Sequence, residues 1–280
     1  MNLPTDAIGV FDSGLGGLTA VKELKKTLPN ENIIYFGDTG RVPYGTRSVD
    51  TIIKYADEDL RFLLTHKIKA VLVACGTVSS VALDVLKQKY SIPIFGVIKP
   101  AAQRAAKLTN NGCIGVLGTP ATIKNAAYEV ALKNVNPNLF VLSKGCPLFV
   151  PLVENGYINS DNQITRLAAN EYLSSFSSKA PDVIILGCTH YPIIKDIIIN
   201  EALNLFGKVS VVDSGACAVN ALKNFLQQSG LINNQGTLGK CCYYVSDDVY
   251  NFNSTAKIFL GKETGTITKV DLESILQNEK

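Results

Sequence analysis

The sequence predicts an α/β protein with two pseudo-symmetric domains, each a mostly parallel sheet flanked by helices. Short, continuously apolar runs typical of buried parallel strands alternate with helical stretches along most of the 280 residues. Nearly every apolar run ends in Gly, Ser, Thr, Asp or Cys, at the position where such folds bind ligands. A chain of this length buries one large core or two ordinary ones, and we expect two.

Composition excludes several classes of protein. Hydrophobic residues make up 46% and charged residues 18%, which indicates a globular chain. The net charge is +3, with no basic block to favour nucleic acid. The start, Met1–Asp6, lacks the pattern of a signal peptide, and no apolar run is long enough to span a bilayer. We therefore expect a cytoplasmic protein that binds neither nucleic acid nor membrane.

The first half of the chain is expected to hold four strands, at residues 7–11, 32–36, 70–73 and 92–98. Helices are expected between them, at 18–28, 49–66 and 78–90. His66 lies among lysines at a helix end and is expected to be a solvated charge partner. The dipeptide Lys99-Pro100 marks the expected crossing into the second domain.

The strand–helix pattern then restarts. Strands are expected at 112–117, 139–142, 183–186 and 209–212, with helices from 118 past Tyr128 and at 148–155, 164–176, 193–205 and 216–228. The tail, 231–280, shows one clear strand at 243–245 and a charged end. The expected domains are residues 1–98 plus 210–280, which carry Cys75, and residues 99–209, which carry Cys188.

A weak internal repeat relates the two halves. Gly9–Gly14 resembles Gly115–Pro120, and Ala74–Thr77 resembles Gly187–His190 at a similar offset along the chain. Two related halves that face each other would place one thiol on each side of a shared cleft. The repeat is therefore most informative about Cys75 and Cys188.

The position of each of the seven cysteines in the predicted fold indicates whether it is reactive or structural. The count is odd and there is no CxxC pair, so most of the thiols are expected to act as small buried hydrophobes. Cys75 and Cys188 differ because each follows a strand and precedes a helix whose N-terminus favours a thiolate. Asp12 could take the proton from one thiol, and Glu154 or His190 from the other.

The glycine loop after the first strand has two interpretations. The dinucleotide pattern GxGxxG fails because Thr19 stands at the third glycine position, so we expect a loop whose backbone N–H groups hold a carboxylate. Asp12 in this loop is either a structural cap, which the loop alone favours, or a catalytic acid.

Three chemistries remain open for the two thiols. One thiol could be a nucleophile with His190 as its base, in a hydrolase or acyl transferase. The thiols could form a redox pair, or they could be two bases on opposite faces of one carbon atom. The third reading explains why both cysteines have matched surroundings, and why hydroxyls and amides that suit carboxylates lie nearby. Buried, inert cysteines are the alternative to all three.

These motifs, taken together, resemble the glutamate racemase family, which supplies D-glutamate for bacterial peptidoglycan. The resemblance spans roughly residues 7–215 and rests on these segments: Asp12–Thr19, Pro43–Gly45, Ala74-Cys75, Gly96–Ile98, Phe149–Glu154 and Leu186–Pro192. It implies a two-domain fold with the active site between the domains, no pyridoxal phosphate or metal, and L- and D-glutamate as small-molecule substrates. We also expect a homodimer.

The resemblance assigns roles to individual residues. It implies that Cys75 deprotonates D-glutamate with help from Asp12, and that Cys188 deprotonates L-glutamate with help from His190 and nearby Glu154. The implied substrate-binding residues are Asp12, Ser13, Pro43, Tyr44, Gly45, Gly76, Thr77, Thr119, Thr122, Thr189 and His190.

One position departs from the family's usual pattern, and another distinguishes the chain from the related aspartate-type racemases. Gly76 stands where the family usually has Asn, and therefore lacks the donors and acceptor of an amide side chain. His190 stands where racemases of the aspartate type usually carry Glu, which favours glutamate as substrate. A non-catalytic dicarboxylate binder on the same fold and a thiol hydrolase are the competing functions.

Overall fold

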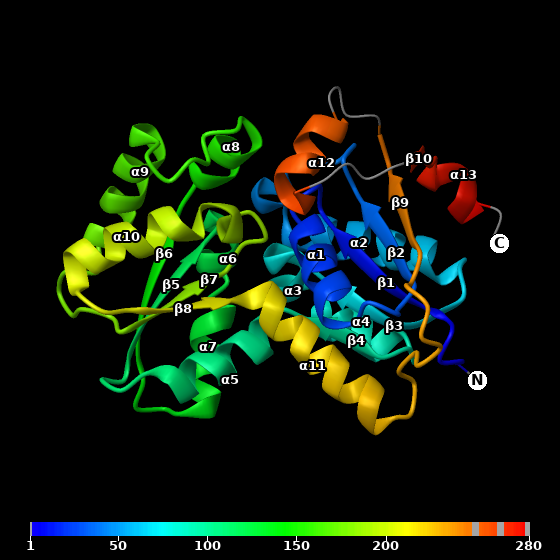
Figure 1. The fold of residues 1–280 in the computed structure, drawn as a ribbon, viewed down its shortest axis with the longest axis horizontal. Helices are drawn as coiled ribbons and strands as arrows, with labels where there is room; N and C mark the ends of the chain where they lie inside the picture. The colour runs from blue at the N-terminus through cyan, green and yellow to red at the C-terminus, as the bar shows by residue number, and fades with distance from the viewer. Residues whose placement is uncertain (1, 248–251, 262–265, 278–280) are drawn as a thin grey trace. The chain divides into compact units, whose positions relative to one another are not determined.

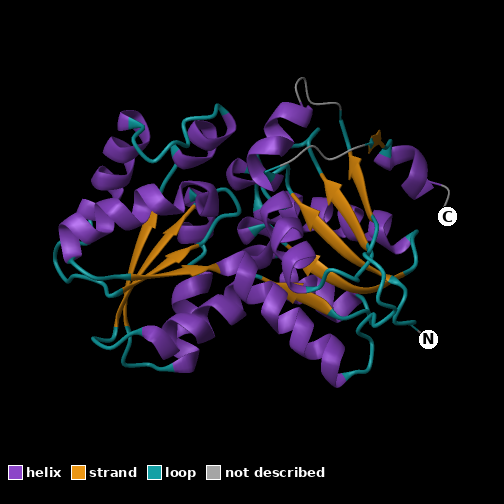
Figure 2. Cartoon of the chain, in the orientation of Figure 1, coloured by secondary structure: helices purple, strands orange, loops and turns teal. Residues whose placement is uncertain are grey.

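The chain divides into two compact units, each with its own parallel sheet flanked by helices (Figures 1 and 2). The structure, a computed structural model, describes residues 2–247, 252–261 and 266–277, so both extreme ends of the first expected domain lie outside it. The first unit comprises residues 1–96 and 218–280, and the second comprises 97–217. This confirms the predicted α/β class with two parallel sheets.

The first unit is built on a sheet of six parallel strands in the order β10-β9-β2-β1-β3-β4. Its strands are β1 (Ala7–Asp12), β2 (Ile33–Gly37), β3 (Ile68–Val73), β4 (Ile94–Gly96), β9 (Cys241–Val245) and β10 (Ile267–Lys269). Every residue of β1 and β3 is buried, as their continuous apolar sequences predict.

Helices flank this sheet. They are α1 (Leu18–Thr27), α2 (Val49–Leu64), α3 (Gly76–Val81), α4 (Leu83–Lys89), α12 (Phe252–Leu260), α13 (Leu272–Gln277) and the short 3-10 turn η1 (Tyr44–Thr46). The single helix expected over 78–90 is therefore two helices that meet at Ala82. The tail holds α12, β10 and α13 besides the one strand expected there.

The second unit is built on four parallel strands in the order β6-β5-β7-β8. They are β5 (Cys113–Gly118), β6 (Phe140–Gly145), β7 (Val183–Leu186) and β8 (Ser210–Asp213). The helices are α5 (Ile98–Leu108), α6 (Pro120–Lys124), α7 (Ala127–Val135), α8 (Phe149–Glu154), α9 (Gln163–Ser174), α10 (Lys195–Phe206) and the 3-10 turn η2 (Tyr191–Ile194).

The crossings between the units differ from those expected. β8 pairs with β7 in the second sheet, so the boundary expected at residue 210 moves into α11 (Ser214–Gln228). A short apolar strand does not reveal which sheet it joins. At the other crossing, β4 ends at Gly96 and Ile98 begins α5. Pro100 is accommodated there because the first turn of a helix leaves its N–H groups unbonded.

His66 is not the solvated charge that the sequence suggested. Its ring packs against Phe62, with centroids 5.3 Å apart, and against Tyr244 at 5.2 Å. Burial lowers the pKa of its imidazole, and its Nε2 atom is buried with no hydrogen-bond partner. A neutral imidazole in an aromatic cluster is therefore the form that the fold holds.

Candidate active site

Asp12 and Cys75 reach the same edge of the first sheet because Asp12 ends β1 and Cys75 comes shortly after β3, its parallel neighbour. Phe11 of β1 pairs with Val73 of β3, so Asp12 and Cys75 both lie at the carboxyl ends of these strands. Cys75 is the N-cap of α3, and its sulfur accepts the backbone N–H of Val78 at 3.5 Å. The thiol also lies 3.4 Å from the hydroxyl oxygen of Ser13.

The surroundings of Cys75 keep its proton in place. Burial, and after it the nearby charge of Asp12, raise the pKa of the thiol to about 12. The hydrogen bonds to Ser13 and to backbone N–H groups act in the opposite direction but are outweighed. Cys75 is therefore a thiol, and not a thiolate, at neutral pH in the substrate-free protein.

Asp12 is the carboxylate that the glycine loop holds. Its Oδ2 accepts the backbone N–H of Gly17 at 2.7 Å, and its side chain is buried. A Cβ atom at Gly17 would lie 2.6 Å from Cβ of Asp12, so the close approach requires glycine. Asp12 therefore holds the glycine loop just before α1, whose N-cap residue is Gly17, and the same carboxylate also acts electrostatically on Cys75.

The segment Pro43–Gly45 follows the end of β2, and its tyrosine points inward. Tyr44 is 1% exposed, and its hydroxyl lies 3.0 Å from Oδ2 of Asp59. The phenol hydroxyl is therefore engaged inside the protein, whereas Pro43 is exposed and Gly45 is partly exposed. Gly76 and Thr77 form the first turn of α3, directly after Cys75.

In the second unit, the turn after β7 is held tightly. The N–H of Gly187 donates to the carbonyl of Leu117 at 2.7 Å. A Cβ atom at Gly187 would lie 2.8 Å from that carbonyl oxygen and 3.0 Å from the ring of Tyr128. The Tyr128 hydroxyl lies 2.8 Å from that of Ser214, which donates to the carbonyl of Leu186 at 2.8 Å. These contacts fix the backbone immediately before Cys188.

Cys188, His190 and Glu154 form a connected row. The sulfur of Cys188 lies 3.8 Å from Nδ1 of His190, and Thr189 Oγ1 lies 3.3 Å from the same nitrogen. On the other side of the ring, Nε2 lies 2.9 Å from Oε1 of Glu154 at the end of α8. The sequence offered Glu154 or His190 as a partner for Cys188, and the structure brings all three together.

This row favours a charged imidazole. Burial alone lowers the pKa of His190, but its hydrogen bonds to Cys188 and Glu154, and their charges, raise it to about 10. His190 is therefore an imidazolium at neutral pH, although it is only 7% exposed. A positive charge 3.8 Å from sulfur stabilises negative charge on that sulfur.

Two threonines lie at the adjacent strand end of the second sheet. Thr119 follows β5 and caps α6, and its hydroxyl lies 3.0 Å from that of Thr122. β5 is the neighbour of β7, so these hydroxyls and Cys188 follow adjacent parallel strands. The structure thus gathers the expected site residues into one group per sheet.

The sequence missed four side chains that hold these groups in place. They are Asp38 and Asp59, which bind the Tyr44 hydroxyl, and Tyr128 and Ser214, which brace the turn before Cys188. Asp38 and Ser214 carry a usable signal, because they directly follow β2 and β8. Asp59 and Tyr128 lie inside helices and carry none.

Fold and site together define a class: a parallel α/β protein of two units, each with a cysteine beside ionisable side chains at its strand ends. The profile of the family described as "Asp/Glu/Hydantoin racemase" matches residues 11–222. A glutamate racemase of Geobacter metallireducens is 44% identical to this chain, over 97% of this chain and 99% of its own length. One of Neisseria meningitidis (strain MC58) is 41% identical over 95% and 96%.

Solved structures agree with the sequence matches. The crystal structure of glutamate racemase from Francisella tularensis in complex with D-glutamate is 40% identical, with a TM-score of 0.89. The match covers 97% of this chain and all of that one. The chain therefore belongs to the Asp/Glu/hydantoin racemase family and, within it, to the glutamate racemases. The resemblance inferred from the sequence motifs is confirmed, and the chain is an isomerase.

Proposed function

We propose that this chain interconverts L- and D-glutamate by moving the α-proton between two cysteines, without a cofactor. The observation that carries the proposal is that each sheet ends in one cysteine with its own ionisable partner. Asp12 accompanies Cys75, and His190 with Glu154 accompanies Cys188. Two such groups supply a base for one face of the α-carbon and an acid for the other.

The protonated thiol of Cys75 suits L-glutamate as the first substrate, because Cys75 can then act as the acid. Cys188, whose sulfur lies 3.8 Å from Nδ1 of His190, acts in its thiolate form as the base and takes the α-proton, and the electron pair left on carbon delocalises into the α-carboxylate. Cys75, which holds its proton, then donates it to the opposite face and gives D-glutamate. Each turnover leaves Cys75 as thiolate and Cys188 as thiol, which is the starting state for D-glutamate.

Asp12 and His190 help to return Cys75 and Cys188 to the protonation states from which the next turnover begins. The thiolate of Cys75 must regain a proton before the next L-glutamate reacts, and the adjacent Asp12 can carry it. His190 can likewise manage the proton of Cys188, with Glu154 holding the ring. Hydroxyls of Ser13, Thr77, Thr119, Thr122 and Thr189, with the backbone of Tyr44 and Gly45, suit the carboxylates and ammonium of the substrate.

The test is solvent isotope exchange at the α-carbon. In D₂O, wild-type protein should incorporate deuterium at Cα of either enantiomer and bring both to a racemate, as circular dichroism would show. Cys75→Ala and Cys188→Ala should each abolish racemisation, whereas Cys242→Ala, at an exposed position of β9, should not. Full racemisation by both active-site variants would refute the two-base mechanism.

The main competitor is a dicarboxylate binder without chemistry. Such a protein would bind glutamate in calorimetry yet leave Cα undeuterated. A thiol hydrolase would instead accumulate an acyl group on Cys188, which mass spectrometry of the intact protein would detect.

We further propose that the product serves peptidoglycan synthesis in the cytoplasm and that the protein is a homodimer. None of the described helices is long and apolar enough to cross a membrane.

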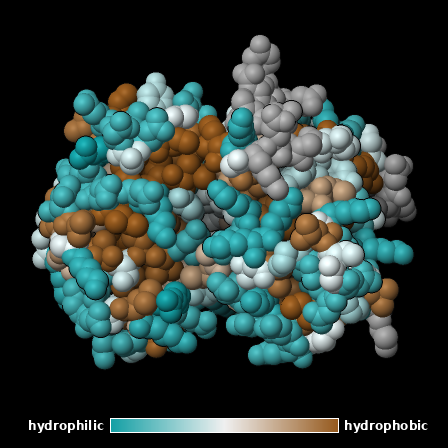
Figure 3. Space-filling view, viewed as in Figure 1, coloured by the Kyte–Doolittle hydropathy of each residue, from teal (hydrophilic) through white to brown (hydrophobic). Residues whose placement is uncertain are grey.

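Hydrophobic residues gather in patches on the face drawn in Figure 3, and Leu148, Ile164 and Leu167 of the second unit are exposed. Exposed apolar side chains of this kind support a contact with a second copy. Sedimentation velocity would test the dimer, and rescue of a D-glutamate auxotroph would test the biological role.

A further inference from the structure

The side chain of Tyr44 lies at the centre of a buried polar cluster. Its hydroxyl hydrogen-bonds Oδ2 of Asp38, which follows β2, and lies 3.0 Å from Oδ2 of Asp59 on α2. Both carboxyl groups are fully buried. We name the cluster the Tyr44 anchor, defined as Asp38, Arg41, Tyr44, Asp59 and Ser246.

Asp38 accepts hydrogen bonds from three side chains. Nε of Arg41 donates to its Oδ2 at 2.6 Å, and the hydroxyl of Ser246 donates to its Oδ1 at 2.7 Å. Tyr44 supplies the third bond. A carboxylate that accepts hydrogen bonds from three donors, one of them a guanidinium, is stabilised in its ionised form.

Asp38 and Asp59 compete for the hydroxyl of Tyr44, which carries a single hydrogen. That hydrogen goes to Asp38, which makes the shorter contact. The 3.0 Å contact between Tyr44 and Asp59 then needs a second hydrogen, which the carboxyl group of Asp59 supplies when it is protonated. Burial and the charge of Asp38 raise the pKa of Asp59 well above its usual range. The charge of Arg41 and the hydrogen bond with Tyr44 lower this pKa but are outweighed.

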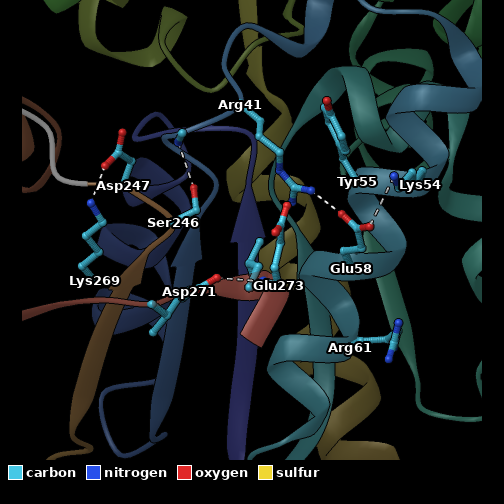
Figure 4. A pocket seen from close by; sticks show the side chains of 13 residues that line it. Arg41, Lys54, Tyr55, Glu58, Arg61, Ser246, Asp247, Lys269, Asp271 and Glu273 are labelled. Carbon is cyan, nitrogen blue, oxygen red and sulfur yellow. Dashed lines mark hydrogen bonds and ion pairs between the residues drawn. The ribbon is translucent and has the colours of Figure 1, made fainter. Parts of the chain in front are cut away.

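Arg41 ties the cluster together. It donates at 2.8 Å to Oδ1 of Asp59. It also donates to Glu58, which pairs with Lys54 at 4.0 Å (Figure 4). The guanidinium also stacks on Tyr55, 4.2 Å from the ring centroid. One cation therefore faces three carboxyl groups, those of Asp38, Glu58 and Asp59, and its single charge cannot balance all three in ionised form.

We propose that Asp38 is ionised and Asp59 neutral, and that this pair fixes Tyr44 so that the turn 43–45 keeps its backbone in position to bind substrate. The inference rests on the proposed function, since the turn matters only if glutamate meets it. Pro43 is exposed and Gly45 is partly exposed, whereas the phenol is sealed inside. Asp38 and Asp59 are therefore positioning residues that act through Tyr44.

The tail of the chain completes the anchor. Ser246 follows β9, beyond the segment 11–222 that matches the family profile, and its hydroxyl also accepts the N–H of Gly40 at 2.8 Å. Next to it, Thr39 donates to the carbonyl of Asp247 at 2.7 Å. The loop after β2 is thus held by α2 on one side and by the tail on the other.

The two carboxyl groups should respond differently to the same substitution. Asp59→Asn keeps an acceptor for Arg41 and an N–H donor for the Tyr44 oxygen, and so mimics a neutral acid. Asp38→Asn removes a charge opposite Arg41 and leaves three donors facing one amide. Glu31→Gln is the matched control, because Glu31 also faces a buried cation, Lys69, at the opposite ends of the strands.

The expected results separate positioning from general stability. Asp38→Asn should raise the KM for glutamate about tenfold while kcat stays within about twofold, since it weakens charge-assisted hydrogen bonds that hold the turn. Asp59→Asn should keep KM within about twofold of wild type, although Asp59→Leu should raise it as Asp38→Asn does. Glu31→Gln should lower the melting temperature without changing KM.

Three outcomes would overturn the inference. If Asp59→Asn raised the KM as much as Asp38→Asn does, Asp59 would be an ionised acceptor. If Asp38→Asn lowered only the melting temperature, as expected for Glu31→Gln, and left the KM unchanged, the cluster would be purely structural. An infrared band of a protonated carboxyl group should vanish in Asp59→Asn and persist in Glu31→Gln, and its persistence in Asp59→Asn would also refute the assignment. Wild-type protein without α-proton exchange would refute the proposed function instead, and the infrared result would still decide the carboxyl pair.

Discussion

Oε1 of Glu154 lies 2.9 Å from Nε2 of His190, so a carboxylate from the end of α8 holds the imidazole that faces Cys188. The opposite ring nitrogen lies 3.8 Å from the sulfur of Cys188. The carboxylate and the sulfur thus contact the two ring nitrogens from opposite sides. A hydrogen on each nitrogen satisfies both contacts, which is the imidazolium form.

The first prediction concerns the titration of the two histidines in the chain. His190 should titrate near pH 10, because its hydrogen bonds and charged neighbours raise its pKa, whereas burial lowers the pKa of His66 below 6.5. NMR of the imidazole protons would show two midpoints on opposite sides of 6.5, assigned with His66→Phe. Glu154→Gln should lower the His190 midpoint, but Glu171→Gln, at an exposed position on α9, should not.

The same shift has a consequence for stability. A folded-state pKa above the unfolded value contributes stability that is complete below about pH 6.5 and is lost as the pH rises through about 10. The melting-temperature difference between wild type and Glu154→Gln should therefore be largest near pH 6 and shrink above pH 10. A difference that grows with pH would contradict the imidazolium assignment.

The second prediction concerns Asp12 and Cys75. Burial is the larger cause of the raised thiol pKa and the charge of Asp12 the second, so Asp12→Asn should lower that pKa but leave it above the usual range. Alkylation of Cys75 at pH 8, followed by mass spectrometry, should therefore be faster in Asp12→Asn than in wild type. Racemisation should nevertheless fall, because the residue that manages the Cys75 proton is gone.

Asp6→Asn is the control for this experiment, since Asp6 lies before β1 at the opposite end of the strand from Cys75. It should leave the alkylation rate unchanged. A slower reaction of Cys75 in Asp12→Asn would show that the carboxylate promotes the thiolate in the substrate-free protein, against the electrostatics described above.

Strand ends were the part of the site that sequence reasoning could find. Asp12, Cys75, Thr119 and Cys188 each follow a continuous apolar run, and parallel strands bring their carboxyl ends to one edge. Local pattern therefore sufficed for these positions. The substrate and the pairing of roles came from the resemblance, because spacing alone left three chemistries open.

The rest depended on contacts that are distant along the chain. Tyr44 was expected among the substrate-binding residues, but no local pattern predicts that Asp59 on α2 contacts its hydroxyl. Nor does any predict that Ser246, beyond β9, donates to Asp38 beside it. The helix that begins at Ile98 was missed because Pro100 suggested a break, whereas the first turn tolerates it. Nothing local marks the breaks at Ala82 and Ala126, where the expected single helices are each divided in two.

The third prediction tests the tight turn before Cys188. In Gly187→Ala the new Cβ would lie 2.8 Å from the Leu117 carbonyl oxygen, a backbone atom that cannot easily move, so the turn must shift. Displacement of a catalytic group by a fraction of an ångström to about 1 Å should lower kcat about tenfold or more, measured by racemisation of L-glutamate.

The control for the turn is Gly207→Ala. Gly207 has a φ of 77° and open space around its Cβ position, so alanine there should cost about 1–3 kcal/mol in stability and leave kcat unchanged. Equal losses of kcat in the two variants would show that stability, and not the position of Cys188, limits activity.

The last prediction concerns Gly76, where the family usually has Asn. Gly76 is the first residue of α3 and lies directly after Cys75, so an amide side chain there would offer donors and an acceptor beside the reacting thiol. Gly76→Asn should lower the KM for glutamate about three- to tenfold, because each added hydrogen bond to a charged group contributes free energy of that order. Gly76→Ala adds a Cβ without the amide and should leave KM near that of wild type or raise it. If both variants change KM alike, the side-chain volume and not the amide is responsible, and the backbone N–H of Gly76 already supplies what the family obtains from Asn.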